Sequence, residues 1–163
     1  MAKHKEEKTN VMRVLDQKKI PYVPHGYPHE EGVAVDAETV AGLIGKPLEE
    51  VFKTLVTKGA KGGYYVFVLP GGGQLDLKKA AKAVGEKSVE MLKVPELLPL
   101  TGYVRGGCSP IGMKKLFPTV FDESVLNLST VTVSAGKIGR QVEVAPGDLL
   151  PLVRAKTADL LVK

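Results

Sequence analysis

Two neighbouring segments with strand composition set the strongest limit on the architecture of this chain. Residues 51–57 and 64–69 are both rich in Val, Phe, Tyr, Thr and Leu, which favour extended backbone. Between them, residues 58–63 contain three glycines and have the composition of a turn. The two segments are therefore predicted to form a β-hairpin, around which the rest of the chain has to pack.

Four further segments have apolar residues at helical spacing and are predicted to form helices. The first three begin at residues whose side chains can accept hydrogen bonds from the first helical turn, and two of them end at a glycine. The four helices are expected from Thr9 to before Pro21, from Asp36 to Gly45, from Asp76 to Gly85, and from Pro146 to Val153.

Short segments with strand composition occupy much of the remaining chain. They are residues 22–25, 88–92, 102–104, 118–122, 130–135 and 140–144, with residues 136–139 turning the last two into a hairpin. Strands and helices thus follow each other without the steady alternation of a parallel α/β sheet. The expected fold is α+β, a single domain with a mixed, barrel-like β-sheet and flanking helices.

Length and composition limit the class of protein. A chain of 163 residues fits one hydrophobic core, and we expect a flexible segment over residues 1–8 followed by one domain over residues 9–163. No run of about 20 apolar residues is present, and the charged N-terminus does not resemble a signal peptide. The only cysteine, Cys108, cannot form an internal disulfide. These features favour a cytoplasmic protein without a membrane partner.

A lysine interrupts the apolar pattern of the first hairpin strand. Side chains alternate between the two faces of a strand, so Lys53 and Leu55 share one face while Phe52 and Thr54 share the other. Because a desolvated ammonium group is costly, a buried Lys53 would need a partner or a cavity. One interpretation is a ligand for an anion or a carbonyl group in a pocket; the other is a strand edge where the lysine reaches water.

A second unusual segment is the string Gly106-Gly107-Cys108-Ser109-Pro110. Glycines expose backbone amides that can approach a ligand closely, and Ser109 adds a hydroxyl group. A plain turn is the alternative, and for such a string taken alone it is the more common one. No general base is visible beside Cys108, which we therefore interpret as a small, semi-buried side chain without a chemical role.

The histidines do not predict a metal site. His25 and His29 are four residues apart, but Pro24, Gly26 and Pro28 exclude the helix that would bring both rings to one face. We expect no metal and no cofactor.

In combination, the motifs resemble the YbaK/EbsC family, the free-standing relatives of the editing domain inserted in bacterial prolyl-tRNA synthetases. The resemblance extends from Thr9 to Val162. The segments that carry it are Lys19–Tyr22, His25 with Tyr27 and His29, Phe52–Leu55, Leu77–Lys82, Thr101–Gly112, and Ser134–Gly139.

This resemblance implies a trans-acting aminoacyl-tRNA deacylase, with Cys-tRNA(Pro) as the first expected substrate. The implied catalytic residues are Lys53, Gly106 and Gly107. The implied substrate-binding residues are Tyr27, Thr54, Ser109 and Gln141. The implied partners are the acceptor end of tRNA(Pro) and prolyl-tRNA synthetase, and a monomer is expected.

The implied reaction needs no protein nucleophile. If the bound amino acid is cysteine, its own thiolate can attack the ester carbonyl, and good orientation supplies about 7 to 11 kcal/mol of the barrier. Many relatives have an aspartate where this chain has Gln141, which can form hydrogen bonds but cannot act as a general base. Removal of another small amino acid such as alanine, and a non-catalytic module that binds a tRNA end or a nucleotide, are the alternatives.

The positive charge of the chain suits an anionic partner. Lysine and arginine total 23 against 18 acidic residues, which gives a net charge of +5. This charge does not discriminate among RNA, DNA, acidic membranes and nucleotides. Basic residues that can contact the phosphates of an acceptor stem, or simply be solvated, are Lys78, Lys79, Lys82, Arg105, Lys114 and Lys115.

Overall fold

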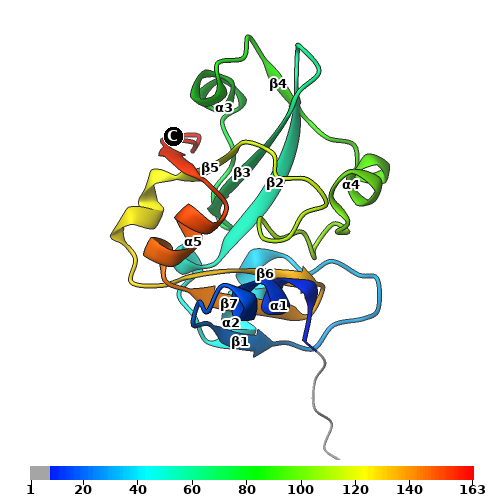
Figure 1. Ribbon diagram of the computed structural model, residues 1–163, viewed down its shortest axis with the longest axis vertical. Helices are drawn as coiled ribbons and strands as arrows, with labels where there is room; N and C mark the ends of the chain where they lie inside the picture. The colour runs from blue at the N-terminus through cyan, green and yellow to red at the C-terminus, as the bar shows by residue number, and fades with distance from the viewer. Residues whose placement is uncertain (1–7) are drawn as a thin grey trace, which may run out of the picture.

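The computed structural model describes residues 8–163, which form two β-sheets with helices around them (Figure 1). The predicted flexible segment over residues 1–8 lies outside the described residues, apart from Lys8. No helix within residues 8–163 has the length and apolar character needed to cross a membrane.

The larger sheet has five strands and is built on the predicted hairpin. Strands β2 (Phe52–Gly59) and β3 (Tyr64–Pro70) pair antiparallel, with Val56 opposite Val66. The other three strands are β4 (Val89–Met91), β5 (Thr119–Asp122) and β8 (Lys156–Ala158). The strand order is β4-β2-β3-β5-β8, in which the β3–β5 and β5–β8 pairs are parallel.

The smaller sheet has three antiparallel strands in the order β1-β7-β6. They are β1 (Val23–Gly26), β6 (Val131–Lys137) and β7 (Arg140–Val144). A bridge between Val51 and Thr132 joins the start of β2 to β6. The predicted mixed α+β domain is therefore confirmed, but the strands of residues 8–163 form two open sheets and no closed barrel.

The four predicted helices are all present. They are α1 (Asn10–Gln17), α2 (Ala37–Ile44), α3 (Leu77–Val84) and α5 (Pro146–Leu152). The side chains of Thr9, Asp36 and Asp76 accept hydrogen bonds from the first turns of α1, α2 and α3. Gly45 and Gly85 end α2 and α3 in the left-handed conformation, as their positions predict.

Three elements were not predicted from the sequence, and one predicted strand is wrong. Residues 94–101 form helix α4 (Val94–Thr101), which contains Pro95 in its first turn and Pro99 inside. Gly102 then ends α4 with a positive φ of 89°, and residues 102–104 form no strand, although one was expected there. Strand β8 and the 3₁₀ helix η2 (Glu123–Asn127) were also missed, and a further 3₁₀ helix, η1 (Leu48–Glu50), follows Pro47.

The five-stranded sheet has a hydrophobic cluster on each face. Helix α3 covers one face, where Phe67, Leu69 and Ala80 are fully buried. The other face packs against the smaller sheet, α1 and α5. A third, small cluster surrounds α2 and includes Tyr27 and Val40. Because Leu55 packs with the α3 cluster and Val56 with the opposite one, Lys53 lies on the α3 side of β2.

Candidate functional site

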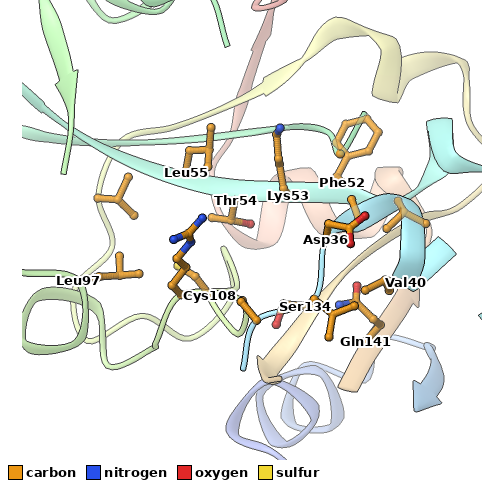
Figure 2. A pocket seen from close by; sticks show the side chains of 18 of the residues that line it. Asp36, Val40, Phe52, Lys53, Thr54, Leu55, Leu97, Cys108, Ser134 and Gln141 are labelled. Carbon is orange, nitrogen blue, oxygen red and sulfur yellow. The ribbon is translucent and has the colours of Figure 1, made fainter. Parts of the chain in front are cut away.

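A cavity of about 690 Å³ lies between the two sheets, along the first half of β2. Its walls come from segments that are far apart in the sequence, and Figure 2 shows how they converge. The lining residues are Tyr27, Ala34–Ala37, Val40, Val51–Val56, Gly71, Met91, Leu92, Val94, Leu97, Arg105, Gly106, Cys108, Ser134 and Gln141.

An uncovered strand edge explains why the cavity forms here. β4 pairs with β2 only from Thr57 onward, and the last contact along this edge is a hydrogen bond of 3.0 Å from the Leu92 amide to the Val56 carbonyl. Residues 52–56 all line the cavity. Side chains from both faces of β2 therefore reach the same space, together with its strand edge.

Lys53 lies at the rim of this cavity. Its Nζ donates a hydrogen bond of 2.7 Å to the carbonyl oxygen of Gly73, and its side chain points away from Ser134 and Gln141 (Figure 2). Partial burial lowers the pKa of the Lys53 ammonium below its ordinary value of 10.5. Lys53 therefore lines a cavity and lies beside an open strand edge, with its ammonium group bonded to a backbone carbonyl, and its role as a ligand for a substrate stays a prediction.

Two polar atoms in the cavity wall have no hydrogen-bond partner within residues 8–163. They are the hydroxyl oxygen of Thr54 and the side-chain carbonyl oxygen of Gln141, and both atoms are buried. The neighbouring Ser134 hydroxyl, in contrast, accepts a hydrogen bond from the Gly136 amide. An unpaired buried polar group costs about 1 to 3 kcal/mol. Thr54 and Gln141 therefore offer hydrogen-bonding groups that the fold itself does not use.

Tyr27 forms part of the wall, as the family resemblance implies. It is buried and belongs to the small cluster around α2. The ring of His29 packs edge-on against it, with 6.1 Å between the ring centroids. Tyr27 therefore shapes the cavity mainly through its aromatic surface.

The glycines of the predicted loop are required by packing. Gly106 has a φ of +86°, and a Cβ atom added there would lie 2.7 Å from the Cβ of Ala34. A Cβ on Gly107 would lie 3.0 Å from the amide nitrogen of Ile138. The Gly107 amide already donates to the carbonyl of Val104, at 2.9 Å. Only Gly106 of the pair lines the cavity, and Gly107 holds the loop against the β6–β7 turn.

Ser109 and Cys108 differ in their relation to the cavity. Ser109 is fully buried, lies outside the lining, and accepts a hydrogen bond of 3.2 Å from the Ile111 amide. Cys108 lines the cavity, but burial raises the pKa of its thiol to about 12. A thiol with this pKa stays protonated at neutral pH, so the geometry gives Cys108 no role as a nucleophile.

The basic residues that were candidates for phosphate contacts lie on different surfaces of the protein. Arg105 is exposed and lines the cavity. Lys78, Lys79 and Lys82 lie on α3, on the other face of the large sheet, and Lys79 donates to Asp159 and to the Leu161 carbonyl at 2.8 Å each. The remaining two basic candidates have local contacts: Lys114 donates to the Pro99 carbonyl, and Lys115 lies over the Phe117 ring.

A carboxylate beside the cavity forms a network that the sequence did not reveal. Glu143 accepts hydrogen bonds from Lys46 at 2.9 Å and Thr130 at 2.6 Å, and is hydrogen-bonded to His25 at 2.9 Å. These contacts hold the pKa of Glu143 at about 2, with the Thr130 hydroxyl as the largest cause. Glu143 and Gln141 project from the same face of β7, so the network braces the strand that carries Gln141.

Other lining residues were also missed by the sequence analysis. Asp36 was recognised only as a helix cap, Met91 ends β4 within the strand predicted over residues 88–92, and Val94 and Leu97 belong to α4, where no helix was expected. A signal for α4 was present, since proline is tolerated in a first helical turn. Within residues 8–163, no group of three or more His, Cys, Asp or Glu residues is arranged to hold a metal ion.

Comparisons with known proteins relate this chain to tRNA editing domains. Residues 31–152 match the family described as the aminoacyl-tRNA editing domain. The chain is 49% identical to EbsC of Enterococcus faecalis, a candidate Cys-tRNA(Pro)/Cys-tRNA(Cys) deacylase, over 100% of this chain and 99% of that protein. It is also 32% identical over 105 residues to the proline–tRNA ligase of Burkholderia thailandensis, which covers 62% of this chain and 18% of the ligase.

Solved structures agree with these sequence matches. The crystal structure of a candidate trans-editing enzyme for prolyl tRNA synthetase aligns with a TM-score of 0.82 and 29% sequence identity. The alignment covers 94% of this chain and 96% of that chain. The hypothetical protein APE2540, at 24% identity and a TM-score of 0.82, shares the fold.

Proposed function

The chain belongs to the aminoacyl-tRNA editing domain family, and on this premise we propose that it is a trans-acting deacylase that removes cysteine from Cys-tRNA(Pro). The observation that carries the proposal is the cavity along the open edge of β2. It combines two unpaired polar side chains with a lysine at its rim, and its only thiol is kept protonated. Such a site suits a substrate that brings its own nucleophile.

In the proposed reaction the substrate thiol loses its proton to solvent, and the thiolate attacks the ester carbonyl of the same cysteinyl group. A C–S bond forms, the bond to the 3′-terminal ribose oxygen breaks, and that oxygen takes up a proton. The products are a cyclic thiolactone and free tRNA. The protein's contribution is to orient the cysteinyl group and to stabilise the negative charge that develops on the carbonyl oxygen.

Each residue that the family resemblance implies has a part in this proposal, including Gly107 and Ser109, which do not line the cavity. Lys53 exchanges its hydrogen bond with the Gly73 carbonyl for one with the substrate and supplies positive charge. Gly106 lets the loop approach the acceptor end, while Gly107 and Ser109 hold that loop in place. Thr54 and Gln141 form hydrogen bonds with the cysteinyl group, and Tyr27 forms the wall against which it lies.

We further propose where the reaction takes place and which protein delivers the substrate. The substrate is a charged tRNA, recognised through its acceptor end, and the cytoplasm is where tRNA is charged. A protein of this size has little surface for reading an anticodon, so prolyl-tRNA synthetase is the proposed partner that delivers the substrate. We expect the protein to act as a monomer.

Deacylation of a panel of charged tRNAs tests the proposal directly. tRNA(Pro) is charged separately with cysteine, alanine, serine and proline, and loss of the ester is followed with the wild type and with Lys53→Ala. Selective release of cysteine that is lost in a folded Lys53→Ala variant supports the proposal. Equal release by the variant would remove Lys53 from the mechanism, and release of alanine alone would identify a different substrate. Absence of any release would favour a non-catalytic binding module.

A further inference from the structure

A second cavity of about 530 Å³ borders the turn that follows β3. Its volume lies within the range of about 300 to 1,000 Å³ that is typical of sites for drug-sized ligands. The two cavities share no lining residue, but the turn borders both of them: Gly71 lines the first cavity, whereas Gly72 and Gly73 line the second. The proposed editing site therefore does not account for the second cavity.

The walls of the second cavity are largely aliphatic. Leu48 of η1, Pro70 at the end of β3, Leu128 after η2 and Leu161 near the C-terminus all line it. The three leucines are only half-buried, so each of them keeps apolar surface in contact with water. A hydrocarbon group bound in the cavity would remove some of this surface from water, which favours binding.

The polar side chains of the second cavity suit a positively charged ligand. They are Glu49, Ser124 and Asn127, and each of them can accept a hydrogen bond. The hydroxyl oxygen of Ser124 is buried and has no hydrogen-bond partner within residues 8–163. Among the lining residues, all of which lie in the described part of the chain, none is a lysine, arginine or histidine. A phosphate or carboxylate would therefore meet no cation, whereas an ammonium group would meet three acceptors, one of them charged.

The turn connects the second cavity to Lys53. The carbonyl oxygen of Gly73 accepts the hydrogen bond of 2.7 Å from the Lys53 ammonium group. The turn is tightly packed, because a Cβ atom added to Gly72 would lie 2.8 Å from Cδ2 of Leu48, and one added to Gly73 would lie 2.8 Å from Cδ2 of Leu161. Both leucines line the second cavity. A ligand there contacts the side chains that hold the turn in place, and it contacts the turn itself.

We propose that the second cavity is an inhibitory effector site for a small molecule with a hydrocarbon body and a protonated amine. The hydrocarbon body contacts the leucines, and the ammonium group donates to the polar side chains. A ligand in this position holds the turn, and with it the Gly73 carbonyl, in the place where Lys53 is bonded to it. In the proposed function, on which the inhibitory effect rests, Lys53 has to leave that carbonyl to reach the substrate. The ligand thus binds the resting state more tightly than the reacting state, which is the condition for coupling between the two sites.

Binding of three matched probes tests the site without depending on catalysis. The probes are 4-phenylbutylamine, 4-phenylbutanol and 4-phenylbutyrate, which have similar hydrocarbon bodies and a cationic, a neutral and an anionic end. Their dissociation constants are measured from the amide signals of Gly72 and Gly73 in ¹⁵N-labelled protein. The amine is expected to bind about tenfold more tightly than the carboxylate, because Glu49 attracts one and repels the other. Equal binding of the two, or no shift of these amide signals with any probe, would overturn the proposal.

Two variants locate the effect. Glu49→Gln removes the carboxylate from the second cavity and is expected to lose most of the preference for the amine over the carboxylate. Because Glu49 is exposed, the variant should keep its fold. The matched control is Glu90→Gln, since Glu90 is an exposed glutamate on β4 that lines neither cavity. The control should bind the probes as the wild type does. An equal loss of preference in both variants would show that net charge, and not the cavity, selects the amine.

Two measurements test the coupling to Lys53. The first is the side-chain signal of Lys53 in protein with ¹³C-labelled lysine, assigned by its absence in Lys53→Arg, which the amine should shift. The second is kcat/KM for deacylation of Cys-tRNA(Pro), which saturating amine should lower about fivefold in the wild type and in Glu90→Gln. Amine binding that changes neither the Lys53 signal nor deacylation would overturn the coupling. A shifted Lys53 signal in a protein that deacylates no tRNA would support the effector site and remove the proposed function.

Discussion

At the scale of single residues, the cavity contains polar atoms whose burial is unfavourable for folding. Thr54 and Gln141 each have a buried oxygen without a partner in the described part of the chain. Thr132 has one as well, but it does not line the cavity. An unsatisfied polar group that faces a cavity is available to a ligand. The Thr132 hydroxyl does not face the cavity, so a ligand bound there cannot reach it.

The first prediction uses this contrast. Gln141→Leu should raise the free energy of unfolding by roughly 1 kcal/mol, because it removes an unpaired buried polar group, and should lower kcat/KM for deacylation at least tenfold. Thr132→Val is the control, since it removes an equally unsatisfied hydroxyl outside the cavity and should stabilise the protein without changing its activity. Urea unfolding and single-turnover deacylation measure the two effects. Unchanged activity in Gln141→Leu would remove this residue from the site.

At the scale of secondary-structure elements, the site depends on how far β4 covers β2. The β2–β4 pairing stops at Thr57, which leaves residues 52–56 beside the cavity. Across the cavity from β2, the loop that contains Gly106 and Gly107 packs against two other segments. Gly106 lies against Ala34, and Gly107 lies against the β6–β7 turn. The Glu143 network joins β7 to β1 and to the segment that follows α2. These contacts fix the distances between the walls of the cavity.

The second prediction concerns the contact between Gly106 and Ala34. Gly106→Ala should destabilise the protein by about 1 to 2 kcal/mol, because it places a side chain in the left-handed region and against Ala34. It should also displace the loop and lower deacylation. The double variant Gly106→Ala/Ala34→Gly removes the contact with the Ala34 Cβ but leaves the backbone strain and a 3.0 Å approach to the Cα of residue 34, so it should recover only part of the lost stability. Thermal unfolding measures this recovery, and a single variant as stable as the wild type would refute the packing role of Gly106.

The third prediction concerns pH and the Glu143 network. The pKa of Glu143 is lowered from 4.5 to about 2, so the unfolded state binds the proton more tightly than the folded state does. The stabilisation, on the order of 2 kcal/mol, is fully present above pH 5 and disappears as the pH falls toward 2. Glu143→Gln should therefore be less stable than the wild type at pH 7, and the difference should shrink between pH 5 and pH 2. Urea unfolding at several pH values measures this difference in stability. A difference that does not depend on pH would contradict the low pKa of Glu143.

At the scale of the whole molecule, positive charge is spread over surfaces that the sheet separates. Arg105 lies in the cavity, whereas α3 carries Lys78 and Lys82 on the opposite face of the five-stranded sheet. With a net charge of +5, the protein attracts an anionic partner over a long range. A bound tRNA contacts Lys78 and Lys82 only if its acceptor stem passes over the face of the sheet that α3 covers.

The fourth prediction tests that path. tRNA binding should weaken with salt, and if Lys78 and Lys82 contact phosphates, Lys78→Gln/Lys82→Gln should reduce the slope of log K against log salt by roughly 0.7 to 0.9 for each lost contact. The control Lys18→Gln/Lys61→Gln removes the same charge at two exposed positions on other elements. Equal slopes in the two double variants would show that only net charge matters and that α3 does not contact the acceptor stem.

The sequence alone determined the local features and the family. Helix caps such as Thr9, Asp36 and Asp76 are readable because each one bonds to an amide two or three residues away, and the glycine stops of α2 and α3 act within a single turn. Helix α4 was not predicted; it contains two prolines, of which Pro95 falls in the first turn, where its missing amide is not needed. The motifs in their order predicted the editing-domain family, which the comparisons confirm.

Only the tertiary structure decided what each motif residue contacts. The Gly107 amide is used within its own turn, and the glycine pair is required by contacts with Ala34 and Ile138, which lie about 30 or more residues away in the chain. Lys79 is held by Asp159, 80 residues later. The open edge of β2 exists because β4 ends where it does, and Val94 and Leu97 line the cavity because α4 folds beside it. Pairings between distant residues leave no periodic pattern in a single sequence, so composition and spacing predicted the elements but not the cavity between them.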